Sequence, residues 1–460
     1  MALLQSDHAL DLLRAIVDRS PADQTEVSLE SVEDRFLRFA SQGPTQNADR
    51  ERHQLSIRVR LGADDERGAF GGWREARATC GTLDDEAVQG TLERALELAE
   101  MSDSNQALVP MEGYSQAQES AAQRPTMDHT LRDKSAWVGL ALEGCEAQGL
   151  EAAGLAQTTA QSRTLVNSAG RSVHGARSRA AFSLTASAPG GEGGSGFAET
   201  IVSNAEMLDA QRTVDRAVAK ACMNRNPEGI EPGTYTVVLE PAAVSALILF
   251  AENHGFGARE FKEQSSFLCG RVGERLFPDS LHVFDDPLND VYPGLPFDGE
   301  GTPKTRKDLL VGGALCDPVT DARLAREMNL PNTAHARPQP CAAGPSTTNL
   351  VVAPGHSSLS ELIAGVPDGL LVSQFHYTNM IEPRDLTLTG MTRNGTFRIE
   401  GGQVGAAVKN LRFTMSLVDA LQNVSGVGSS LEVAGALFDG EVICPALRID
   451  NFRFTSATDF

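Results

Sequence analysis

The segment TRNGTFRIEGGQVGAAVKNLRF, Thr392 to Phe413, predicts antiparallel β-sheet. Its dipeptides Asn394-Gly395 and Gly401-Gly402 are residue pairs that favour tight hairpin turns. Further segments with the character of strands surround it: GLLVSQF (369–375), SLEVAGAL (430–437) and ICPALRIDNFRFTS (443–456). We therefore expect the C-terminal half of the chain to be a mainly antiparallel β domain.

The region before residue 230 alternates between strand and helix patterns. Apolar residues alternate with polar ones over residues 55–61, as in a half-buried strand, and residues 84–102 are typical of a helix. The segment TEVSLESVEDRFLRFA (25–40) predicts two short strands. The Gly-rich run PGGEGGSG (189–196) lacks the Lys-Ser/Thr of a phosphate-binding loop and predicts a hairpin tip.

These patterns indicate an α+β fold built from three units. We expect an N-terminal α/β subdomain of hairpins and helices at 1–105 and a central subdomain with long strands and flanking helices at 106–230. The C-terminal, mainly antiparallel β domain then covers 231–460. A chain of 460 residues is long enough for two to three domains.

The charge composition bears on which classes of molecule the protein can bind. Asp and Glu total 61 against 40 Lys and Arg, which gives a formal net charge of -21. Proteins bind phosphate backbones through basic patches, so this balance argues against direct nucleic-acid binding and against anionic membranes. No apolar run reaches the 18 residues of a membrane-spanning helix.

The N-terminus and the cysteines point to the cytoplasm. The first 20 residues contain Asp7, Asp11 and Arg14 among apolar residues, which suits an amphipathic helix and not a signal peptide. The seven cysteines are scattered and odd in number, without a C-x-x-C pair. We expect reduced thiols and a cytoplasmic location.

The stretch LFAENHGFGARE, Leu249 to Glu260, raises the question of a metal site, because a His-Gly pair follows an apolar helical run. A catalytic zinc needs three protein ligands, an open position and a carboxylate base. The chain has nine histidines, no two of them within six residues of each other, and no H-E-x-x-H. Residue types and spacing alone therefore define no zinc site.

A set of motifs in the C-terminal half nevertheless resembles a known family. The set comprises the T-R-N-G-x-F-x-I-E-x-G hairpin, the V-K-N-L-R-F strand, the P-A-L-R-I-D-N strand and S-S-F-L-C-G-R-V-G-E (265–274). Residues 232 to 458 resemble the C-terminal domain of the TldD/PmbA (TldE) metalloprotease family. The resemblance implies an N-terminal α/β part, a largely antiparallel C-terminal domain and a dimer that encloses a cavity.

The family's catalytic, TldD-type subunit has H-E-x-x-x-H on a helix and a Cys ligand near the C-terminus. A gapless register from G-R-V-G-E aligns His254 with the second His, Leu249 with the first His and Phe250 with the catalytic Glu. A register from P-A-L-R-I-D puts the Cys position at Leu431. Leu and Phe neither ligate zinc nor accept a proton, so the resemblance implies a TldE-type subunit without catalytic residues. His254 is the one remaining metal-ligand candidate, and we favour a structural or interface role for it.

Two further features bear on function. Glu252 lies two residues beyond Phe250, about 200° round the helix, so it does not simply replace the lost base. Gln374, His376 and Asn379 end a strand where the family lines its substrate cleft, although ordinary strand-end polarity explains them equally well.

The favoured hypothesis is a non-catalytic subunit that holds no zinc itself. It would complete the chamber of a zinc-bearing, TldD-like catalytic partner in a heterodimer that acts on unfolded or leader peptides. Two alternatives stay open: a self-sufficient metallopeptidase with a rearranged metal site, and a homodimeric peptide-binding protein.

Overall fold

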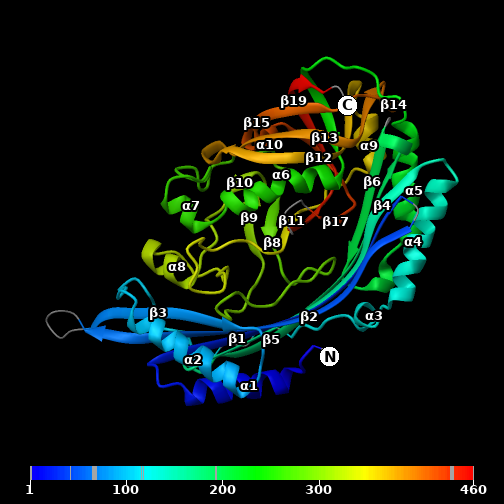
Figure 1. Ribbon diagram of the computed structural model, residues 1–460. Coiled ribbons are helices and arrows are strands. Elements are labelled where there is room, and N and C mark those ends of the chain that lie inside the picture. The colour runs from blue at the N-terminus through cyan, green and yellow to red at the C-terminus, as the bar shows by residue number, and fades with distance from the viewer. Residues whose placement is uncertain are drawn as a thin grey trace.

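The computed structural model describes residues 3–41, 43–64, 70–114, 117, 119–191, 194–435 and 440–458. Within these residues an α/β region comes first and a mainly sheet region follows, which confirms the predicted α+β class (Figure 1). The N-terminal region forms one strongly curved sheet that wraps around the C-terminal half.

The curved sheet contains six antiparallel strands in the order β3-β2-β1-β4-β5-β6 within the described residues. Their bounds are β1 (Gln24–Ser41), β2 (Gly43–Asp64), β3 (Phe70–Cys80), β4 (Glu151–Asn167), β5 (Ser172–Ser187) and β6 (Ser195–Val202). Because β1 pairs with both β2 and β4 over nearly its full length, one sheet spans the predicted boundary at 105–106. The Gly-rich run 189–196 joins β5 to β6, and its residues 192 and 193 lie outside the described ranges.

The prediction of two short strands at 25–40 is wrong, because β1 is one strand of 18 residues. The charged segment Glu33–Arg35 in its middle does not break the strand, because β2 and β4 supply hydrogen-bonding partners on both sides. Buried and partly exposed residues alternate from Ser28 to Asp34, Arg35 interrupts the alternation, and Glu33 itself is buried.

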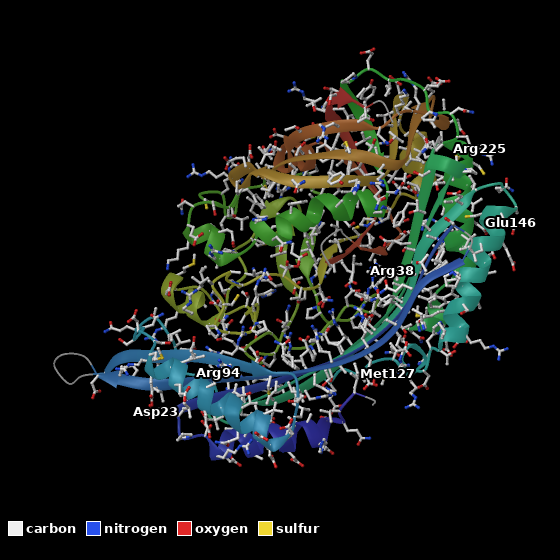
Figure 2. The ribbon with its side chains drawn as sticks, viewed as in Figure 1. Asp23, Arg38, Arg94, Met127, Glu146 and Arg225 are labelled. Carbon is white, nitrogen blue, oxygen red and sulfur yellow. The ribbon has the colours of Figure 1, made fainter. Side chains whose placement is uncertain are left out.

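Helices cover the outer face of the curved sheet (Figure 1). They are α1 (Ser6–Arg19), α2 (Asp85–Glu100), the short α3 (Arg124–Met127), α4 (Leu131–Glu146) and α5 (Ala210–Met223). Leu13, Ile16 and Leu92 of α1 and α2 pack on β1 to β3, while α4 and α5 pack on the other end of the sheet. The inner face is polar: Figure 2 shows Arg38 of β1 on the side that faces the C-terminal half.

The C-terminal half is centred on a closed ring of five strands. They are β7 (Thr234–Leu239), β12 (Asp368–Glu382), β13 (Thr387–Glu400), β15 (Leu411–Ser416) and β19 (Leu447–Ala457). The ring closes because β12 pairs with β7 on one side and with β13 on the other. Four buried phenylalanine side chains pack together inside this ring of strands: Phe375, Phe413, Phe452 and Phe454.

Of the two predicted hairpin turns in this ring, only one is a turn. Gly401 and Gly402, with φ of 56° and 77°, join β13 to β14 (Gln403–Ala407). Asn394 and Gly395 also have positive φ, at 57° and 123°, but they lie inside β13. The pairing with β12 shifts at this point, so the two residues form a bulge. Residues that adopt positive φ easily occur in bulges as well as in turns, which is why the sequence pattern wrongly predicted a turn at Asn394-Gly395.

A second sheet lies between this ring and the curved sheet, in the order β10-β9-β8-β11-β18-β17 within the described residues. Its strands are short: β8 (Val283–Asp285), β9 (Lys307–Val311), β10 (Ala314–Leu315), β11 (Leu350–Val352), β17 (Glu432–Gly435) and β18 (Glu441–Cys444). The remaining elements are α6 (Pro241–His254), α7 (Ala258–Lys262), α8 (Ala322–Met328), α9 (Leu359–Ala364), α10 (Leu417–Gln422) and β16 (Val424–Val427).

Candidate functional site

Helix α6 holds the positions to which the resemblance draws attention. Pro241 sits in its first turn, and the helix ends at His254, with Gly255 as the capping residue. A Cβ at Gly255 would lie 2.6 Å from the Phe267 ring, so close packing requires glycine here. The helix is apolar on nearly all sides because it lies between β12 and the strands β17 and β18.

Beside the C-terminal end of α6 lies an open hollow of about 640 Å³, here called the α6 pocket. Leu249, Phe250 and His254 all line it, so the structure brings these three predicted positions together. Leu249 is 4% exposed and packs into the wall. Glu260 lies across the pocket, and burial raises the pKa of its carboxyl. The wall thus presents two hydrocarbon side chains where zinc chemistry needs a ligand and a base.

Leu431, the fourth predicted position, lies elsewhere. It packs against a separate buried cluster that includes Ile201, Val433 and Ile443, and it does not line the α6 pocket. Gly440 is the residue that lies against Leu249, since a Cβ there would be 2.4 Å from Leu249 Cδ1. A gapless register therefore does not bring Leu431 to α6.

The donor set of this chain does not fit a resident zinc at α6. Leu249 and Phe250 carry no lone pair, and Leu431 packs on other elements. Within the described ranges, no group of three or more His, Cys, Asp or Glu side chains is arranged to hold a metal ion. His254 is a single imidazole, which is too few ligands for zinc.

Glu252 faces a different space from Phe250, as its position on the helix predicts. It lines a cavity of about 310 Å³, here called the inner cavity, together with Arg177 of β5, Lys304, His335 and Arg337. Burial, followed by the nearby charge of Asp285, raises the pKa of Glu252 to about 8. The side chain is therefore largely protonated at neutral pH, and Arg337 lies in the walls of both spaces.

A buried polar network supports one wall of the inner cavity. Asp285 is fully buried, and its Oδ2 lies 2.9 Å from Lys304 Nζ and 3.1 Å from His335 Nε2. Its Oδ1 accepts backbone N–H bonds from Thr348 and Asn349 at 2.7 and 2.6 Å. These four interactions hold three separate loops around one carboxylate.

The charges in this network follow from burial and pairing. Burial favours protonation of Asp285, but the Lys304 ammonium and the His335 hydrogen bond outweigh it and hold the pKa of Asp285 well below its ordinary value. Burial lowers the pKa of His335, against the opposing effect of Asp285. The network is thus an aspartate–lysine ion pair whose carboxylate also accepts a hydrogen bond from His335 Nε2.

The predicted substrate residues do not gather around one space. Gln374 Oε1 accepts a bond of 2.8 Å from Asn394 Nδ2, and exposed Asn379 donates to the Tyr377 carbonyl at 3.1 Å. His376 lines another hollow with Arg393, where partial burial and then that arginine lower the pKa of the imidazole. A substrate role for Gln374, His376 and Asn379 stays a prediction.

Known protein families match both the central part and the C-terminal half of this chain. The family model of the PmbA/TldA metallopeptidase C-terminal domain matches residues 232–456, and that of the central domain matches residues 129–225. A metalloprotease of Methanothermobacter thermautotrophicus is 24% identical over 324 residues, 67% of this chain and 69% of that protein. A metalloprotease TldD homolog of Buchnera aphidicola is 25% identical over 222 residues, which span 47% of this chain and 45% of the relative.

Among solved structures, TldE from Thermococcus kodakarensis superposes with a TM-score of 0.84 at 19% identity, covering 97% of this chain and 99% of that one. This likeness shows the shared fold. Together with the domain matches it defines a protein of metallopeptidase architecture. The chain belongs to the PmbA/TldD metallopeptidase family. None of the helices in the described part of the chain has the length and hydropathy to cross a membrane.

Proposed function

We propose that this chain is a TldE-type, non-catalytic subunit of a zinc metalloprotease and that it completes the chamber of a TldD-like catalytic partner. One observation carries the proposal: Leu249 and Phe250 line the α6 pocket at the positions that the register aligns with a zinc ligand and the catalytic base. A subunit that keeps the architecture but presents hydrocarbon at these positions acts most simply through another subunit's zinc.

The geometry does not favour the alternative of a rearranged metal site in this chain. Glu252 is the acidic residue of α6, and it lines the inner cavity, away from His254. Within the described residues, the carboxylates that share the α6 pocket with His254 are Glu260 and Glu263, and no second His or Cys lines this pocket to complete a zinc site.

The substrates we propose are unfolded or leader peptides. Extended peptides bind to sheet edges by adding a strand, with affinity from backbone hydrogen bonds and little demand on sequence. Within the described residues, β17 is the last strand of the second sheet and packs beside α6, so we propose its outer edge for such pairing, with Gly435 N already bonded to Glu199. The net charge of -21 disfavours nucleic acid as a partner.

We also place the protein in the cytoplasm. All seven cysteines are free thiols in the structure, as expected of a chain kept in a reducing compartment.

Co-expression with a relative that carries an intact H-E-x-x-x-H tests the partnership. We expect a one-to-one complex whose interface buries on the order of 2,000 Å² or more, as in obligate assemblies. The control is the same relative expressed without this chain. If the two chains elute separately and this chain forms a homodimer that binds extended peptides, the accessory-subunit proposal fails and the binding-protein alternative replaces it.

A further inference from the structure

The inner cavity contains two guanidinium groups without a carboxylate partner among the described residues. Arg177 Nε donates to the Gln161 amide oxygen at 2.9 Å, and no ion pair involves this side chain in the described ranges. Arg337 Nε is buried and makes no hydrogen bond in the described part of the chain. Two arginines without an ion pair in the described residues thus line a cavity inside a strongly acidic protein.

Three other charged groups of the cavity wall are paired, whereas Glu252 and Asp298 make no ion pair within the described residues, and burial raises the pKa of both carboxyls. Lys304 pairs with Asp285 at 2.9 Å, and Arg163 pairs with Glu30 at 3.1 Å. Glu441 is neutralised by Arg179 at 2.5 Å. Arg177 and Arg337 are therefore the cations in this wall that have donors left for a ligand.

A third unused donor lies in the same wall. Thr347 is only 2% exposed, and its Oγ1 has no hydrogen-bond partner in the described chain. Its position is fixed, because the next two residues both donate backbone N–H bonds to Asp285. Buried hydroxyl groups without partners are uncommon and destabilising, so this one points to a ligand.

The donors define the chemistry of that ligand. Guanidinium groups bind carboxylates through paired N–H bonds, and a hydroxyl adds a third donor. A dianionic phosphate would bring two negative charges to a wall that contains the unpaired carboxyls of Glu252 and Asp298, whereas a carboxylate brings one. The volume of about 310 Å³ lies at the lower end of small-ligand pockets.

We propose that the inner cavity binds the carboxylate of a small organic acid or of a peptide C-terminus through Arg177, Arg337 and Thr347. Arg337 also lines the α6 pocket, so a peptide lying there would present its terminal carboxylate to the same guanidinium. This site goes beyond the proposed function and does not depend on a partner subunit.

Isothermal titration of the full-length chain tests the site with three probes: N-acetyl-trialanine, its C-terminal amide and propionate. We expect a carboxylate probe to bind at least tenfold more tightly than the amide, because the amide loses charge-assisted hydrogen bonds. Binding of the acetylated peptide identifies a peptide terminus as the source, and binding of propionate alone identifies a small acid. Equal affinity of peptide and amide, or no carboxylate binding at millimolar concentration, overturns the proposal.

Matched variants locate the binding. Arg177→Gln and Arg337→Gln should each weaken it at least tenfold, whereas Arg271→Gln, at an exposed arginine outside the cavity, should leave it unchanged. Thr347→Val removes only the unpartnered hydroxyl, so it should fold normally and bind several-fold more weakly. If all three cavity variants bind as the parent does, the assignment is wrong.

Discussion

Replacing Asp285 by Asn should destabilise the fold by about 3–5 kcal/mol, because breaking a buried ion pair leaves the other charge uncompensated. Asp285 is fully buried and Lys304 is 4% exposed, so water does not reach the ammonium that remains. Asparagine keeps the shape of the side chain and an acceptor for the backbone N–H groups. The loss in the free energy of unfolding therefore measures mainly the removal of the negative charge that pairs with Lys304.

The pH dependence of this effect has a definite sign. The pKa of Asp285 is depressed in the folded state, chiefly because Lys304 and His335 outweigh burial. Ionised Asp285 therefore stabilises the fold above its unfolded-state pKa, about 3.9, and this stabilisation is lost as the pH falls below that value. The difference between parent and Asp285→Asn should therefore shrink as the pH falls below about 4.

Urea unfolding followed by circular dichroism measures the difference. The matched control is Asp308→Asn, whose carboxylate is 46% exposed and pairs with Arg306 at 3.0 Å, and it should cost less than about 1 kcal/mol. Adding Lys304→Met to Asp285→Asn should recover part of the loss, because no unpaired charge is then buried. A loss in Asp285→Asn no larger than in the control would refute the reasoning.

Three further outcomes are expected. The purified chain should carry almost no zinc by elemental analysis, and near-stoichiometric zinc that disappears in His254→Ala would contradict the reading of the α6 pocket. The double variant Leu249→His, Phe250→Glu should give no chelator-sensitive peptidase activity, because Leu431 packs away from the pocket and the third ligand is still missing. Robust cleavage would show that another side chain completes the zinc site. Glu252→Gln should stabilise the protein increasingly from pH 5 to 8, by at most about 1.4 kcal/mol per pH unit. The reason is that the folded-state pKa of Glu252 is raised to about 8, so ionisation of this carboxyl favours the unfolded state. Equal stability changes in urea titrations at pH 5.5 and 7.5 would show that Glu252 is already charged in the folded protein.

Local pattern predicted much of the fold. The strands of the C-terminal half and the turn at Gly401-Gly402 follow from residue periodicity and turn chemistry. The length of β1 and the bulge at Asn394-Gly395 could not be predicted from local pattern, because pairing with strands distant in the sequence decides both. Closure of the five-stranded ring is likewise set by contacts far apart in the sequence.

The candidate site was predictable only where it lies on one helix. Spacing along α6 placed Leu249, Phe250 and His254 around one pocket and Glu252 elsewhere. The inner cavity carried no such signal, since Arg177, Arg337 and Thr347 come from separate segments that share no motif. The gapless register placed Leu431 at the ligand position, but in the structure Leu431 packs on another cluster and Gly440 lies against Leu249.

The most direct test of the central claim is peptide cleavage by the purified complex of this chain with a zinc-motif relative. Our account predicts activity in the complex that is abolished when the glutamate of the relative's H-E-x-x-x-H is changed to Gln, while His254→Ala in this chain costs less than about tenfold. Cleavage that survives the change in the relative but disappears in His254→Ala would contradict it, because the catalytic zinc would then belong to this chain.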